Sequence, residues 1–189
     1  MSQAIITGGP TMRPTAARPG LAALVSDVRA AVDEHTGWGE TAALVADALH
    51  RQLPAPDLLT AEERAGDPRS YRSRLLHAEP DGTFSIVAVV WRPRQVTPIH
   101  DHVTWCVVGV LQGVEQEELF RCPTGDYLER AGHSANLVGS VSGFAPPGDI
   151  HRVHNPTEST TISLHIYGTD ISRVGSSVRH EYDLPIRPE

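Results

Sequence analysis

Between residues 72 and 167 the sequence is a succession of short apolar segments separated by Gly, Pro and Asp. Segments of this length, rich in β-branched and aromatic residues and bounded by turn residues, are typical of β-strands. The segments with this composition are 72–77, 84–91, 105–111, 115–121, 142–145 and 160–167. Six short strands with such turns predict a mainly β fold, a small barrel or sandwich.

The region before these strands has helical periodicity instead. Apolar residues recur at helical spacing over residues 21–50, with a turn at Thr36 and Gly37, which predicts two amphipathic helices. A further short helix is expected from Thr60. We therefore expect a helical cap at about residues 20–66, packed on the β-barrel within a single domain, 20–189. Residues 1–19 carry three prolines and two glycines and predict a flexible arm.

The charge and composition exclude several classes of function. The 23 acidic residues outnumber the 16 basic ones, giving a net charge of −7, so neither nucleic acid nor an anionic membrane surface is expected as a partner. No apolar run approaches the ~20 residues of a membrane-spanning helix, and the first residues lack the apolar core of a secretory signal. We expect a cytoplasmic protein. The two cysteines are too few for a disulfide framework, and the sequence leaves the oligomeric state open.

Histidines form two candidate metal-binding segments. His100 and His102 are two residues apart on extended backbone, so their side chains point the same way and can share one metal ion. His151 follows a Pro-Gly turn and would complete a three-histidine set. His154 competes for that place, but it has the opposite strand parity, so we assign it to the surface or to a supporting position.

Both segments resemble the two conserved motifs of the cupin superfamily. The first motif is matched by His100, His102, Cys106 and Gly113, and the second by Pro146, Gly148, His151 and Asn155. Cys106 occupies the position of the usual glutamate ligand, and Arg94 stands where the first motif begins with glycine. The resemblance implies a cupin fold, a jelly-roll-like β-barrel.

Replacement of the glutamate by Cys106 makes the chain similar to the thiol dioxygenases, of which cysteine dioxygenase is the best-known member. Segments 71–77, 98–113 and 163–168 also resemble that family, which covers about residues 70–170. The resemblance implies Fe(2+) as cofactor, held by His100, His102 and His151, and a small thiol and O2 as reactants. The implied reaction converts L-cysteine to cysteine sulfinate. Alternatives are 3-mercaptopropionate as substrate, another oxidised sulfur product in a biosynthetic pathway, or a non-catalytic metal- or ligand-binding cupin.

The chemistry of three neutral imidazoles agrees with this. They leave iron(II) its full positive charge and open positions, which favours an anionic, soft ligand such as a thiolate. Zinc also binds three histidines, so the spacing alone leaves the metal open.

The resemblance also implies further catalytic residues. Ser163, His165 and Tyr167 alternate along one strand and therefore share a face. In the thiol dioxygenases this trio is a hydrogen-bonded relay whose tyrosine reaches the iron site. Animal cysteine dioxygenases carry a cysteine at the position of Cys106 that becomes linked to that tyrosine, so a Cys106–Tyr167 thioether and a plain buried thiol both remain open.

The substrate-binding residues depend on an alignment that differs by one residue. The family selects its substrate by a residue two positions after the tyrosine matched by Tyr71, where Arg pairs with the carboxylate of cysteine. One alignment places Ser73 there and another Arg74, and on a strand these two face opposite sides. We favour Ser73, with Arg72, Arg173 or Arg179 as the group that would then bind the carboxylate. Trp105 is a further candidate for the pocket.

Two other features are expected to be structural. Trp91 ends an apolar strand and predicts a core side chain. Glu115, Glu117 and Glu118 are interpreted as a solvated strand face.

Overall fold

The computed structural model describes residues 18–187 and contains the predicted N-terminal helices. They are α1 (Leu21–Val32), α2 (Trp38–Arg51), a 3-10 helix η2 (Pro56–Leu58) and α3 (Ala61–Arg64). The short helix expected from Thr60 is α3, whose first turn is capped by the Thr60 hydroxyl accepting from the Glu63 N–H. The arm predicted at residues 1–19 falls almost entirely outside the described residues.

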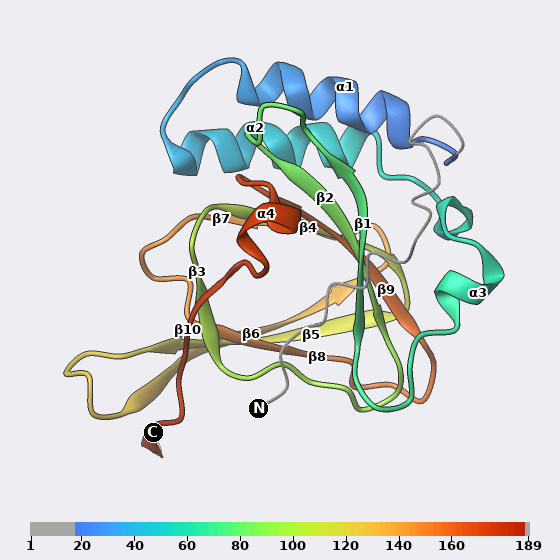
Figure 1. The fold of residues 1–189 in the computed structure, drawn as a ribbon. Helices are drawn as coiled ribbons and strands as arrows, with labels where there is room; N and C mark the ends of the chain where they lie inside the picture. Colours follow the sequence, from blue (N-terminus) through green and yellow to red (C-terminus); the bar gives the residue numbers. More distant parts are fainter. Residues whose placement is uncertain (1–17, 188–189) are drawn as a thin grey trace.

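Two antiparallel-dominated sheets follow and curl around a common interior (Figure 1). The strands are β1 (Arg72–Ala78), β2 (Ser85–Trp91), β3 (His100–His102), β4 (Cys106–Gln112), β5 (Val114–Arg121), β6 (Leu128–Leu137), β7 (Val141–Phe144), β8 (His151–His154), β9 (Thr161–Tyr167), β10 (Val178–Glu181) and β11 (Ile186–Arg187), with a short helix α4 (Ile171–Val174) before β10. One sheet has the order β1-β2-β9-β4-β7, the other β10-β3-β8-β5-β6-β11. The predicted mainly β barrel with N-terminal helices packed on it is confirmed.

The central strands of the first sheet are buried on both faces, and β2 is also apolar on both. Every residue of β2 and of β9 is buried. On β2, Ile86, Ala88 and Val90 belong to the core beneath the helices, whereas Val87, Val89 and Trp91 belong to the core inside the barrel. A continuous apolar run such as that of β2 therefore indicates a strand that is buried on both faces.

Helices α1 and α2 lie on the outer face of this sheet (Figure 1). α2 approaches β4 closely at Gly109, where an added Cβ would come within 2.8 Å of the Leu49 and Leu53 side chains. The helices thus close one side of the barrel wall and hold its inner face in place. Within residues 18–187, no helix has the length and apolar character needed to cross a membrane.

Several strands were not predicted from the sequence. β6 pairs along most of β5, yet nearly all its residues are exposed or half-buried, so its sequence carries little apolar alternation. β10 and β11 are short edge strands with the same character. β3 has only three residues, and its pairing rather than its composition makes it a strand.

Truncation of Leu49 tests the packing of the cap on the sheet. Leu49 is fully buried between α2 and β4, so Leu49→Ala should lower the free energy of unfolding by about 2–5 kcal/mol. Leu137→Ala, at a side chain that is 58% exposed, should change it by no more than about 0.5 kcal/mol. Urea denaturation measures both, and equal effects would show that the cap is not part of the cooperative core.

Candidate functional site

Three histidines meet inside the barrel, on two paired strands of the second sheet. His100 and His102 begin and end β3, and His151 begins β8, where it lies directly opposite His100. One potential ligand atom from each lies within 4.8 Å of the others, and all three residues are buried. The histidines predicted to bind metal are therefore brought together. His154 is half-buried and lines a separate outer groove, as its strand parity predicted.

A hydrogen-bond acceptor fixes the orientation of each imidazole. The Nδ1 atoms lie 3.0 Å from the Pro98 carbonyl for His100, 3.0 Å from Asp149 Oδ2 for His102 and 2.6 Å from Glu117 Oε1 for His151. A carbonyl or carboxylate oxygen only accepts, so each Nδ1 carries the hydrogen and each Nε2 keeps its lone pair. All three rings thus present the nitrogen that a metal needs.

Burial also favours the neutral form of two of these rings, those of His100 and His102. Burial lowers the pKa of His100 well below its usual value, and the neighbouring His151 lowers it further. Burial likewise lowers the pKa of His102, although the hydrogen bond to Asp149 opposes this effect. Neutral imidazole is the form that coordinates a metal ion.

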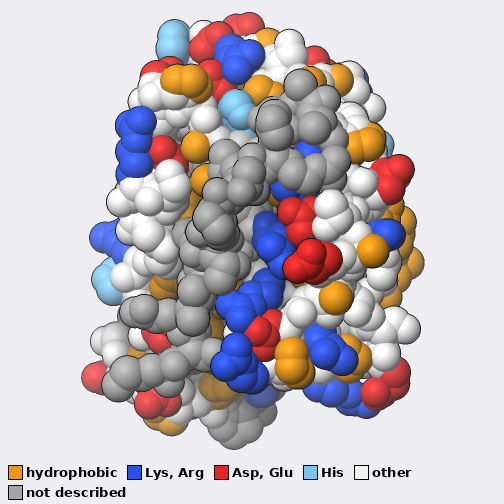
Figure 2. All heavy atoms as spheres, turned by 45° about the vertical axis from the view of Figure 1, so that its right-hand side comes forward, with side chains coloured by type: hydrophobic (Ala, Val, Ile, Leu, Met, Phe, Trp, Pro, Cys, Tyr) orange, Lys and Arg blue, Asp and Glu red, His pale blue; other side chains and the backbone are white. Residues whose placement is uncertain are grey.

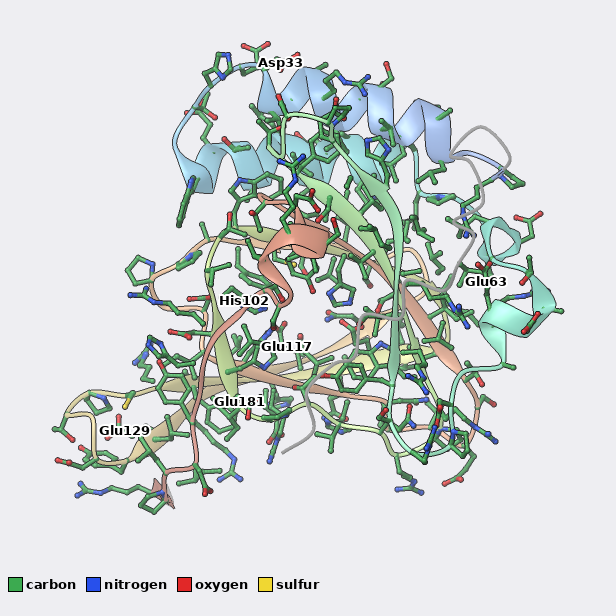
Figure 3. All side chains as sticks on the ribbon, viewed as in Figure 1. Asp33, Glu63, His102, Glu117, Glu129 and Glu181 are labelled. Atoms are coloured by element: carbon green, nitrogen blue, oxygen red, sulfur yellow. The ribbon has the colours of Figure 1, made fainter. Side chains whose placement is uncertain are left out.

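The interpretation of the β5 glutamates as a solvated face is wrong for two of the three residues. Glu115 is only 2% exposed and Glu117 is bonded to His151, because both point into the barrel. Glu118 faces outwards and accepts from Arg152 Nε at 2.7 Å. Glu115 and Glu117 alternate with Glu118 along the strand (Figure 3 labels Glu117 beside His102). Glu115 and Glu117 are two residues apart, so they share a face of the strand. This spacing is the sequence signal that could have identified them as inward-facing residues. Asp149, two residues before His151, was also missed.

The predicted relay residues lie on the opposite inner wall, on β9. Ser163 Oγ is 2.9 Å from His165 Nε2, and His165 Nδ1 is 3.3 Å from the Tyr167 hydroxyl. Trp91, expected to be a core residue, is buried and also donates its indole N–H to Ser163 Oγ at 3.2 Å. These contacts are satisfied when Ser163 donates to His165 and His165 donates to Tyr167. The Tyr167 hydroxyl hydrogen then remains available to the barrel interior.

Tyr167 lies next to the histidine cluster and to Cys106. Its ring stacks with that of His102 at 6.4 Å between centroids. Burial raises the pKa of Tyr167 well above its usual value, so the hydroxyl is protonated at neutral pH. Cys106 is fully buried and pairs with Tyr167 across β4 and β9, and burial raises the pKa of its thiol. The pairing makes the two residues neighbours, and it is compatible with both alternatives, the thioether and the plain buried thiol.

A cavity of about 70 Å³ joins the three histidines to Tyr167 and His165. Ser73 lines it from β1, where it pairs with the inward-facing Val89, and Tyr71 lines it from just before this strand. Arg74 does not line the cavity, because it pairs with Ala88, which faces the helices. This register places Ser73 rather than Arg74 at the site.

Trp105 also differs from the expectation for a pocket residue. It is buried in the core beneath the helices, on the other side of β4 from Cys106. Its indole ring packs so tightly against Gly168 that a Cβ there would lie 2.2 Å from the indole nitrogen. Trp105 therefore supports the sheet and does not line the cavity.

The arrangement can bind one metal ion and hold a proton beside it. The nearby acidic side chains, Asp149 and Glu117, are turned to the Nδ1 side of the rings, so the described donor set consists of imidazoles alone. Such a set suits a divalent transition metal and leaves positions for further ligands.

Several solved structures of other proteins are similar to this chain. Similar solved structures include a Cupin 2 conserved barrel domain protein from Salinispora arenicola, with 20% identity, a TM-score of 0.41, and coverage of 56% of this chain and 80% of that one. The Cnp3 cupin domain of Schizosaccharomyces pombe aligns at 14% identity and a TM-score of 0.42, covering 56% and 65%. A Cupin_2 domain of an XRE family transcriptional regulator from Enterobacter cloacae aligns at 14% identity and a TM-score of 0.39, covering 51% and 94%.

The family match is more specific than these likenesses. The model of the cysteine dioxygenase type I family matches residues 64–176. This segment contains the three histidines, the relay residues and both cysteines. Since the match spans well over half of the 189 residues, the protein belongs to the cysteine dioxygenase type I family.

Proposed function

We propose that the protein is an iron(II)-dependent thiol dioxygenase, which adds both atoms of O2 to the sulfur of a small thiol and forms a sulfinic acid. The observation that carries this proposal is the set of three buried imidazoles that face one cavity, with the Tyr167 side chain on the opposite wall. In the net reaction the thiol loses its S–H bond and gains two S–O bonds. O2 supplies both oxygen atoms and accepts the electrons.

The donor set fits iron(II). His100, His102 and His151 would hold the ion through their Nε2 atoms, and iron(II) would supply positions at which a thiolate and O2 can meet. Glu117 and Asp149 fix the rings from behind, as carboxylates commonly do for metal-binding histidines.

Residues on the opposite wall of the cavity would orient the hydroxyl hydrogen of Tyr167, and apolar side chains would exclude water. The chain from Trp91 through Ser163 and His165 orients the Tyr167 hydroxyl, which can donate a hydrogen bond to a reactant in the cavity. Val87, Val89 and Val153 line the same space and keep it apolar. In such surroundings one positioned hydrogen bond is stronger than it would be in water.

Oxygen consumption tests the proposal directly. Protein loaded anaerobically with iron(II) should consume O2 when a small thiol is added, and with labelled O2 both labelled atoms should appear in the product. Mass spectrometry of the product provides the readout. Iron-loaded protein that leaves every small thiol unchanged would instead indicate a cupin that binds metal without turnover.

The histidines of β8 provide a matched pair for metal binding. His151→Ala should weaken iron(II) binding by more than about 100-fold, because it removes a ligand rather than a supporting group. His154→Ala, on the opposite face of the same strand, should leave binding unchanged. Metal titration followed by elemental analysis measures both, and retention of iron by the His151 variant would refute the assigned ligand set.

The glutamates of β5 provide a second pair. Glu117→Gln weakens the acceptor for His151 Nδ1, so iron(II) affinity should fall by about 10–100-fold. Glu118→Gln, which alters only the outward-facing pairs with Arg152 and Arg130, should have no such effect. Equal affinities in competition with a chelator would show that Glu117 does not orient the ligand.

Tyr167→Phe removes the last hydroxyl of the relay. It should retain iron(II) but lower kcat by about 100-fold, because the positioned proton donor is lost. Tyr182→Phe is the control, since its hydroxyl bonds to Asp101 away from the cavity. Single-turnover oxygen consumption compares the two, and an undiminished rate in the Tyr167 variant would exclude the hydroxyl from the chemistry.

A further inference from the structure

The cavity beside the three histidines has no positively charged wall. Among residues 18–187, no arginine lines it, and the sequence contains no lysine. Apart from the imidazoles and the Trp91 indole, its polar side chains are hydroxyls, from Tyr71, Ser73, Thr97, Tyr167, Ser176 and Ser177. The remaining lining is apolar or glycine. A ligand bound here would meet neutral hydrogen-bonding groups and no cation.

The arginines nearest to this wall in the sequence are turned away from it. Arg72 donates from Nε to Asp67 at 3.1 Å. Arg74 is on the outer side of β1, because its partner Ala88 faces the helices, and the outer face near α3 also carries the ion pair of Arg18 with Glu63 at 2.9 Å. Figure 3 shows Glu63 on α3, outside the barrel, and Figure 2 shows blue basic and red acidic side chains side by side on this outer face.

Two further arginines lie beyond the cavity. Arg173 pairs with Asp170 at 3.0 Å. Arg179 lines an adjoining outer chamber that shares Tyr71 and His100 with the cavity, but it is exposed and shares that chamber with Glu181. Its charge is therefore in contact with solvent, which screens it.

Carboxylates, by contrast, surround the histidines. Asp149 and Glu117 contact the rings of His102 and His151, and Glu115 is buried behind His165. Glu115 Oε2 lies 3.7 Å from His165 Nε2 and has no hydrogen-bond partner. None of these three carboxylates lines the cavity, but all lie close behind its imidazoles. A ligand carboxylate in the cavity would therefore be buried with no arginine or lysine of residues 18–187 beside it to pair with, which is unfavourable.

We propose that this site takes small thiols whose other end carries no carboxylate, so that the end group is an amine, an amide or a hydroxyl. The hydroxyls of Ser73 and Thr97 can hydrogen-bond to any of these without a change of charge. An ammonium end would also be attracted by the surrounding carboxylates. The inference rests on the proposed thiol oxidation and specifies its substrate class, which departs from the L-cysteine implied by the sequence resemblance.

Substrate pairs that differ only in the charged end provide the test. Iron-loaded wild-type protein is assayed for oxygen consumption with L-cysteine against L-cysteinamide, 3-mercaptopropionate against its amide, and cysteamine. The proposal expects kcat/KM at least about tenfold higher for each amide than for its acid, and cysteamine oxidised faster than L-cysteine. Acids oxidised as well as or better than their amides would overturn the substrate class while leaving thiol oxidation intact. No oxidation of any thiol would overturn both.

Two variants test which residue determines the preference between acid and amide substrates. Ser73→Arg places a guanidinium at the cavity wall and should shift the acid-to-amide ratio of kcat/KM by about tenfold towards the acid. Arg179→Ala should leave that ratio unchanged. A selective loss of acid oxidation in the Arg179 variant would show that the entrance arginine binds a carboxylate, which would also overturn the proposal. Because the wild-type comparison stands alone, a Ser73 variant that fails to fold does not remove the test.

Discussion

The site depends on the pairing of two very short strand segments, β3 and β8. This pairing sets His100 opposite His151 and leaves His102 on the same side. Each ring is then held at Nδ1 by an oxygen that can only accept, so its Nε2 lone pair is directed to the common centre. Without these acceptors the rings could rotate or change tautomer, and three histidines would not make one binding site.

The first sheet supplies the opposite wall because it is buried on both faces. Residues of one parity on β2, β4 and β9 pack beneath α1 and α2, and those of the other parity point inwards. The inward set on β9 is Ser163, His165 and Tyr167. The N-terminal helices thus do not touch the site, yet their packing determines which side chains reach it.

Local pattern was sufficient to predict six of the strands (β1, β2, β4, β5, β7 and β9), the cap helices and the convergence of His100, His102 and His151. The rest required information that no local segment contains. β6 has almost no apolar face. Glu117 and Asp149 act through contacts with rings on other strands. The choice between Ser73 and Arg74 depends on a one-residue register against β2, and the position of Trp105 follows from the parity of its neighbour Cys106.

A crystal structure of the iron(II)-loaded protein with a small thiol bound would test the central claim most directly. The account predicts iron on the Nε2 atoms of His100, His102 and His151, with the ligand sulfur beside it and Tyr167 facing both. Iron held by Glu117 or Asp149, or located away from these histidines, would contradict it.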